Sequence, residues 1–232
     1  MVFIGLDVSK ISTALCIEND NEIILYSYTT KKENNIWVKQ TSDYINYRFI
    51  NYKYNDEQDY SKSELLKLDE FSKVSDLIIS DINNDIKKIA IEGYSYNSRG
   101  PIFDLIEFTT ILKYKLIQSL DISNIEIMSP LTLKSECCKL VYKPRLELKG
   151  KKVIKEILHY ENNKGKQATK FDKWDMFNAF IDSDLDIKLK YWCKDNEKEI
   201  AKNKEVPKPL DDIIDAIWLK EIKKRQLIRE NN

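Results

Sequence analysis

Glycine is scarce in this chain. Only five of the 232 residues are glycine, and none lies between Val8 and Lys88. Folds that hold nucleotide phosphates on backbone N–H groups need glycine-rich loops at the starts of helices. An ATP phosphotransferase of the actin and sugar-kinase type also begins with a strand, an aspartate and a threonine-rich turn. The lack of glycine makes it a poor fit, and it stands only as the alternative from a different functional class.

Cysteine and histidine patterns typical of metal sites are missing as well. The four cysteines are Cys16, Cys137, Cys138 and Cys193. They lack the spacing of a zinc site, and the adjacent pair cannot easily coordinate the same ion. We expect them to be reduced thiols. The single histidine, His159, lies in a lysine-rich stretch of helical character, and we assign it no catalytic role.

The chain also lacks net charge, a signal peptide and a long apolar run. Its 38 basic and 38 acidic residues cancel, so no global field attracts a polyanion and any nucleic acid binding must be local. The first residues have no basic n-region, and no segment approaches the ~20 apolar residues of a membrane span. We expect a soluble, intracellular protein with no membrane partner.

Apolar segments with regular spacing are present along most of the chain. They predict strands over residues 2–6, 13–17, 23–29, 87–93 and 125–129, and helices over residues 61–85, 101–120 and 210–226. This order predicts an α/β fold in which helices flank a mixed sheet, with an additional basic segment that is helical in patches.

The expected domain organisation is one domain over residues 1–232. The tyrosine-rich residues 30–60 would form a long third strand, or an insertion such as an extended hairpin. Residues 160–206 would form a second insertion before the terminal helix.

Carboxylates lie within the most apolar segments or at their ends. Asp7 and Glu92 each end a predicted central strand, where ligand sites in such sheets usually lie. Asp212 and Asp215 share one face of the terminal helix, because helical residues three apart are neighbours. Apolar residues flank both, so we expect them to face protein rather than water. If that helix packs over the strand ends, the four acids converge.

Four converging carboxylates need a counter-charge. At ~5 Å and an effective dielectric of ~20, each pair repels by roughly 3 kcal/mol, so a cluster without a cation would protonate or separate. Oxygen ligands without histidine or cysteine suit Mg²⁺ or Mn²⁺ rather than Zn²⁺. Two such ions ~4 Å apart can activate a water and stabilise the leaving oxygen of a phosphodiester. We therefore expect a two-ion site.

Each acid also has a simpler explanation. Asp7 would fit a turn, Glu92 a strand end, and Asp212 a helix N-terminus that the macrodipole favours. Asp215, surrounded by apolar neighbours, is the hardest to explain in this way. The joint placement of all four favours the metal site and argues against a catalytically inactive scaffold, in which one of them would be expected to be lost.

Four blocks of the sequence together resemble one family. They are "IGLDVSKISTALCI", "IAIEGYSYNSRGPIFDLIEFTTILKYKL", "MSPLTLK" and "DDIIDAIWL". In this order, and with Asp-x-x-Asp-Ala on an apolar helix, they resemble the RuvC-type Holliday junction resolvases of the ribonuclease H-like nucleases, especially the viral and phage branch. The resemblance covers roughly residues 1–29, 87–158 and 207–222.

The resemblance implies a crossover junction endodeoxyribonuclease with Asp7, Glu92, Asp212 and Asp215 as its catalytic, metal-binding acids. It also implies a homodimer, with the predicted helix 101–120 at the interface, that binds four-way DNA junctions and nicks two strands symmetrically. A viral or phage member would work in the host cytoplasm or at the nucleoid.

Local charge and aromatic residues suggest where branched DNA would lie. Residues 134–173 contain twelve basic and five acidic residues, a net charge of +7. The glycine-rich basic stretch of the family is represented only by the sequence around Gly150. Lysine runs are often just solvated surface, and the tyrosines beyond Glu92 would equally fit packing on the next helix. The residues expected to contact DNA are Tyr94, Tyr96, Arg99, Lys134, Lys149, Lys151, Lys152 and Lys155.

A second nucleic acid alternative is the catalytic core of a DEDD insertion-sequence transposase. Such proteins share the acid pattern, and "GLDVSK" suits them too. The short stretch after Asp215 would leave no room for a second catalytic domain, which disfavours this alternative.

Overall fold

The structure is a computed structural model that describes residues 2–20, 22–82, 86–94, 102–146 and 158–230. The chain forms two compact units. Unit 1 comprises Met1–Met128 and Lys208–Asn232, and unit 2 comprises Ser129–Pro207. The expectation of one domain over the whole chain stays a prediction.

Unit 1 is built on a six-stranded sheet of order β4-β3-β2-β1-β5-β6. Its first three strands form an antiparallel meander of β1 (Val2–Asp7), β2 (Ser12–Glu18) and β3 (Ile23–Thr29). In these strands most residues on both faces of the sheet are apolar, as expected for strands that are covered on both sides. The sheet is mixed and flanked by helices, which confirms the expected α/β fold and is consistent with the ribonuclease H-like sheet that the resemblance implies.

Two further strands extend the other side of β1. β5 (Ile86–Glu92) runs parallel to β1, and β6 (Ile125–Met128) runs parallel to β5. In the register of β1 and β5, Gly5 pairs with Ala90 and Leu6 with Ile91. The last residues of the two strands therefore lie next to each other at the same edge of the sheet.

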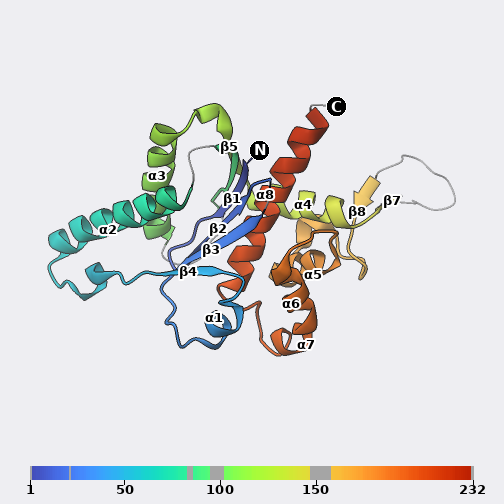
Figure 1. The fold of residues 1–232 in the computed structure, drawn as a ribbon, viewed down its shortest axis with the longest axis horizontal. Helices are drawn as coiled ribbons and strands as arrows, with labels where there is room; N and C mark the ends of the chain where they lie inside the picture. Colours follow the sequence, from blue (N-terminus) through green and yellow to red (C-terminus); the bar gives the residue numbers. More distant parts are fainter. Residues whose placement is uncertain (1, 21, 83–85, 95–101, 147–157, 231–232) are drawn as a thin grey trace. The chain divides into compact units, whose positions relative to one another are not determined.

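Helices cover both faces of this sheet (Figure 1). Alternate strand residues point to opposite faces. Ile4 and Leu6 of β1 belong to a core that also contains Phe71 of α2 (Tyr60–Asp81) and Phe108 of α3 (Ile102–Ser119). Gly5 faces α8 (Leu210–Glu230) instead, since a Cβ there would lie 2.6 Å from the backbone nitrogen of Lys220. The residues of β1 that point to one face of the sheet thus contact α2 and α3, and those that point to the other face contact α8.

A buried ion pair also joins α8 to the sheet. Lys220 is 1% exposed, and its ammonium lies 2.6 Å from the Glu18 carboxylate of β2 and 3.1 Å from that of Glu221. Burial alone lowers the pKa of Lys220, but the surrounding negative groups, Glu18 and Glu221 among them, raise it above its ordinary value. The charged pair fixes the position of α8 along β2.

Residues 30–60 differ from the long strand or hairpin that their alternating tyrosines suggested. They contain α1 (Ile36–Thr41), the short strand β4 (Asn46–Phe49) and a 3-10 turn, η1 (Lys53–Asp56). β4 runs parallel to β3, so the two do not form a hairpin. The helical crossover begins at Asn35, whose side chain accepts hydrogen bonds from the backbone N–H groups of Trp37 and Val38. Whether the segment is an insertion stays a prediction.

Unit 2 is mostly helical. Its core includes Phe177, Phe180 and Leu189, and the N-terminus of α5 is closed by a capping box between Asp172 and Asp175. Its elements are α4 (Pro130–Val141), β7 (Pro144–Leu146), β8 (Leu158–Tyr160), η3 (Ala168–Lys170), α5 (Lys173–Asp182), α6 (Lys188–Asp195) and α7 (Glu197–Ile200). The short η2 (Ile122–Asn124) precedes β6 in unit 1.

All four cysteines are buried and unbridged, as their spacing led us to expect. Burial raises the pKa of Cys193 to about 12, which keeps this thiol protonated and inert. The expectation that His159 lies in a helical stretch is wrong, because its backbone pairs with Arg145 in the β7–β8 ladder. In the described ranges, no helix combines the length and apolar character that crossing a bilayer requires.

Candidate metal centre

Three carboxylates from three separate elements meet in unit 1. Asp7 ends β1, Glu92 ends β5 and Asp215 lies in the second turn of α8. One oxygen from each lies within 4.8 Å of the others, and this is the group of potential metal ligands found in the part of the chain that the structure describes. Asp7 and Asp215 are each only 3% exposed, and Glu92 is half-buried. Among the described residues, this cluster is the candidate site.

Local structure explains why these side chains meet. Asp7 and Glu92 follow the paired residues Leu6 and Ile91, so the parallel register brings both carboxylates to the same edge of the sheet. Asp7 lies two residues after Gly5 in β1, so its side chain points to the same face of the sheet, the one that α8 covers. Ala216, whose carbonyl oxygen lies against Gly5, directly follows Asp215. The close packing of α8 on β1 therefore carries Asp215 to the strand ends.

The donors of this cluster suit a hard divalent cation. All three are carboxylate oxygens, and neither histidine nor cysteine belongs to the group. Mg²⁺, Mn²⁺ and Ca²⁺ prefer such ligands, whereas structural zinc sites draw on cysteine and histidine. At ~4.8 Å and an effective dielectric of ~20, each pair of ionised carboxylates repels by roughly 3 kcal/mol. A bound dication would remove this repulsion, so the residues present fit the metal that the sequence led us to expect.

The fourth predicted acid, Asp212, has a different arrangement. It is 2% exposed and lies one turn before Asp215, but it does not belong to the group of three. The ammonium group of Lys208 donates a hydrogen bond to Asp212 Oδ1 and lies 3.4 Å from Asp211 Oδ2. The structure therefore brings together three of the four predicted acids and pairs the fourth with a lysine.

Lys208 is a site residue that the sequence did not reveal to us. Burial lowers its pKa, but the charges of Asp212 and Asp211, and more weakly that of Asp7, outweigh burial and raise it well above the ordinary value. Lys208 is therefore a permanent cation beside the acid cluster. The only signal in the sequence is its spacing of three and four residues from two helical aspartates, which is typical of ordinary surface ion pairs.

The residues expected to contact DNA are only partly described. Tyr94 donates a hydrogen bond from its hydroxyl to the carbonyl oxygen of Ile106, and the Lys113 ammonium lies 4.6 Å from the centre of its ring. This tyrosine therefore packs on α3, as in the alternative considered from the sequence. Lys134 lies on α4 of unit 2 and is partly exposed. The residues outside the described ranges are Tyr96, Arg99, Lys149, Lys151, Lys152 and Lys155.

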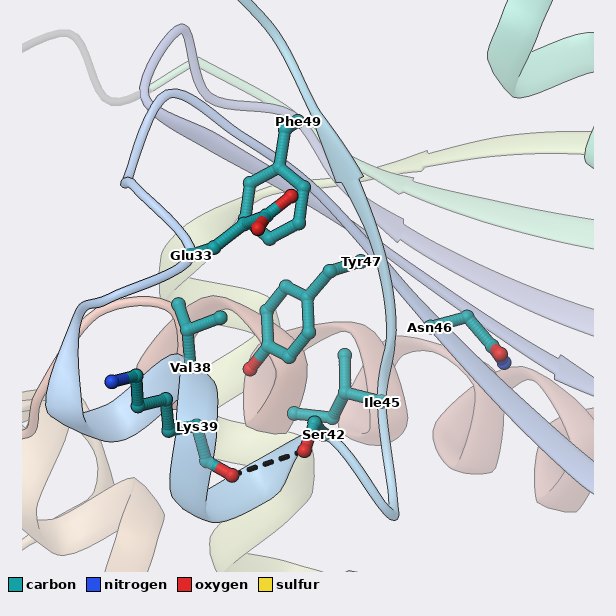
Figure 2. Close-up of a pocket in the computed structure, with 8 residues that line it drawn as sticks. All are labelled: Glu33, Val38, Lys39, Ser42, Ile45, Asn46, Tyr47 and Phe49. Atoms are coloured by element: carbon teal, nitrogen blue, oxygen red, sulfur yellow. Dashed lines mark hydrogen bonds between the residues drawn. The ribbon is translucent and has the colours of Figure 1, made fainter.

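A separate pocket of about 390 Å³ lies between α1 and β4 (Figure 2). Val38, Ile45, Tyr47 and Phe49 give it an apolar lining, and Glu33 is its single acid. The Tyr47 hydroxyl lies 2.6 Å from that of Thr41, which fixes the ring against α1. With one carboxylate it offers no cluster of metal ligands, so we assign it no part in the chemistry of the site.

Comparisons with known proteins give structural neighbours only. No protein-family model matches the sequence, and no curated protein matches it. Two similar solved structures are the "Thermus thermophilus RuvC structure", 9% identical, and "T. thermophilus RuvC in complex with Holliday junction substrate", 8% identical. Each match covers 97% of this chain and 96% of the other chain, with a TM-score of 0.41. Similarity at this level does not assign the chain to a family.

Proposed function

We propose that this chain is a divalent-metal-dependent nuclease that hydrolyses phosphodiester bonds. The observation that carries the proposal is the convergence of Asp7, Glu92 and Asp215 within 4.8 Å of one another. Burying carboxylates together is unfavourable unless a cation holds them. Two-metal and related oxygen-ligand centres that act on phosphodiesters use such ligands. A purely structural role would not require three acids from three distant segments to meet.

The contribution of the chain is to hold its ligands rigidly. Asp7 and Glu92 end neighbouring parallel strands, so the hydrogen-bonded register fixes their separation. Asp215 is fixed by the packing of α8 against Gly5. Sites on strands and helices hold their geometry more accurately than sites on loops. A bound divalent ion would polarise a phosphoryl oxygen and lower the pKa of a water that attacks phosphorus.

We further propose that the substrate is branched DNA and that the working form is a homodimer. Support for the substrate comes from the sequence blocks that resemble junction resolvases and from the net charge of +7 over residues 134–173. Support for the dimer comes from α3, which exposes Phe103 by 77% and Tyr114 by 62%. Large exposed apolar side chains on one helix suit association with a second copy.

The direct test is a cleavage assay with purified protein. A synthetic four-way junction, a fork, a flap and a linear duplex would each be incubated with Mg²⁺, with Mn²⁺ and with EDTA. We expect cleavage that requires the metal, with the junction cut fastest and in two strands. Metal-dependent cutting of all four substrates at equal rates would retain the nuclease and reject the junction preference. No cleavage of any substrate would contradict the proposed function.

A charge-reversal variant tests the proposed DNA contacts. Replacing Lys151 and Lys152 by glutamate removes two expected phosphate contacts, each of which contributes about 0.9 to the slope of log K against log salt. We expect weaker junction binding and a slope reduced by about 2, measured by fluorescence anisotropy between low and moderate salt. The matched control is Lys73→Glu, since Lys73 lies exposed on α2 in unit 1 and pairs with Asp69. An unchanged slope would remove Lys151 and Lys152 from the interface.

A further inference from the structure

Lys208 places a fixed positive charge at the edge of the acid cluster. Its ammonium group contacts Asp212 and lies 3.4 Å from Asp211, and these two side chains are 2% and 7% exposed. Its charge also acts on Asp7, one of the three clustered acids. A lysine ammonium is compact and carries three donors. Two of the acids on α8 are therefore already neutralised in part by a group that belongs to the chain.

This pairing bears on how many metal ions the centre can hold. Two ions about 4 Å apart need ligands on both sides of a shared carboxylate. Asp7, Glu92 and Asp215 can surround one ion, and a second would have to draw on Asp212. The Oδ1 atom of Asp212 accepts the hydrogen bond of Lys208, so a second dication would approach an ammonium group of like charge. A dication and an ammonium group held at such a short distance repel each other strongly.

We propose that the centre binds a single divalent ion at Asp7, Glu92 and Asp215, and that the Lys208 ammonium takes the position and the electrostatic role of a second ion. The inference rests on the proposed function. The Lys208 side chain is 37% exposed, so its remaining donors are accessible to a phosphate oxygen of a bound substrate. A preorganised cation next to the reacting phosphate stabilises the charge that develops there. Lys208 is thus a positioning residue for Asp212 and a phosphate-binding group.

Counting bound ions tests this inference without measuring activity. Mn²⁺ alone would be titrated into the full chain and followed by isothermal calorimetry and by the loss of the free-ion signal in electron paramagnetic resonance. We expect one ion per chain for the parent protein. Lys208→Met removes the charge, and with it the hydrogen bond to Asp212, with little change in side-chain length, so we expect two ions. Lys208→Arg retains the charge and should bind one.

Each outcome separates the inference from the function on which it rests. Two ions in the parent protein would reject the role of Lys208 and leave the metal-dependent nuclease intact. No binding by the folded parent would contradict the metal centre itself. One ion in Lys208→Met, with a circular dichroism spectrum like that of the parent, would show that lysine does not exclude the second ion. If Lys208→Met does not fold, two ions in Lys208→Arg would reject the inference.

Discussion

Asp215→Asn should abolish metal-dependent cleavage while the protein stays folded. Asparagine has nearly the same volume as aspartate but lacks the negative charge that holds a hard cation. Weakening the support of a metal ligand typically costs 10- to 100-fold, so loss of a ligand carboxylate should lower the cleavage rate by at least about 100-fold. Asp215 is 3% exposed, and removing its charge also relieves repulsion from Asp7 and Glu92. The thermal midpoint without metal should therefore stay the same or rise.

Rates of junction nicking in Mg²⁺, paired with junction binding in EDTA, would measure this effect. Binding should stay close to that of the parent, because the substitution leaves the basic residues unchanged. Asp69→Asn is the matched control, since Asp69 lies exposed on α2 and pairs with Lys73. It should cut at the parental rate. An Asp215→Asn protein that cuts as fast as the parent would falsify the assignment of this acid.

Gly5→Ala should both destabilise unit 1 and remove activity. A Cβ at this position would lie 2.6 Å from the backbone nitrogen of Lys220 and even closer to the carbonyl oxygen of Ala216. Backbone atoms of a helix cannot rotate away, so α8 would have to move off β1. Overpacking of this kind costs about 3 kcal/mol or more, which corresponds to a fall in Tm of roughly 6–12 °C for a chain of this size. Asp215 would move with α8 and leave the cluster.

Differential scanning calorimetry and Mn²⁺ titration would measure the two effects together. Gly93→Ala, at the residue that directly follows the neighbouring strand β5, is a graded control. Its Cβ would lie 3.2 Å from Cγ2 of Ile127 and 3.3 Å from the carbonyl oxygen of Met128, so shifts of a few tenths of an ångström accommodate it. Its Tm should fall much less than that of Gly5→Ala. A Gly5→Ala protein with the parental Tm and metal affinity would show that α8 does not approach β1 at this point.

Hydrophobic pattern predicted the elements that hold the site. Short apolar runs identified β1 and β5, and the acid at the end of each run belongs to the cluster. The apolar surroundings of Asp215 correctly indicated a buried position in the terminal helix. These features depend on local patterns, which a sequence displays directly. The convergence of Asp7, Glu92 and Asp215 follows from strand ends and helix faces that could be assigned separately.

The features that the sequence did not reveal depend on contacts between segments. Lys208 resembled part of a charged linker, because nothing local distinguishes an ion pair with buried acids from a solvated one. Asp212 shares a helix face with Asp215, yet it lies outside the group of three acids and accepts a hydrogen bond from Lys208. Gly5 is an unremarkable strand residue until α8 packs against it. Helix α1 was not predicted from the sequence, because its six residues are too few to show a clear helical period and the alternating tyrosines nearby favoured a strand.

Two ligands of the proposed centre, Asp7 on β1 and Asp215 on α8, lie far apart in the sequence, so the order of protein synthesis bears on when activity can arise. The ribosome makes Asp7 early and Asp215 late, and a growing polypeptide that still lacks α8 carries an incomplete set of ligands. Bringing residues so far apart in the sequence into contact also costs chain entropy, which slows this step of folding. The proposed nuclease activity would therefore arise only after Asp215 has been made and α8 has docked on β1, which protects nearby nucleic acid from an incomplete enzyme.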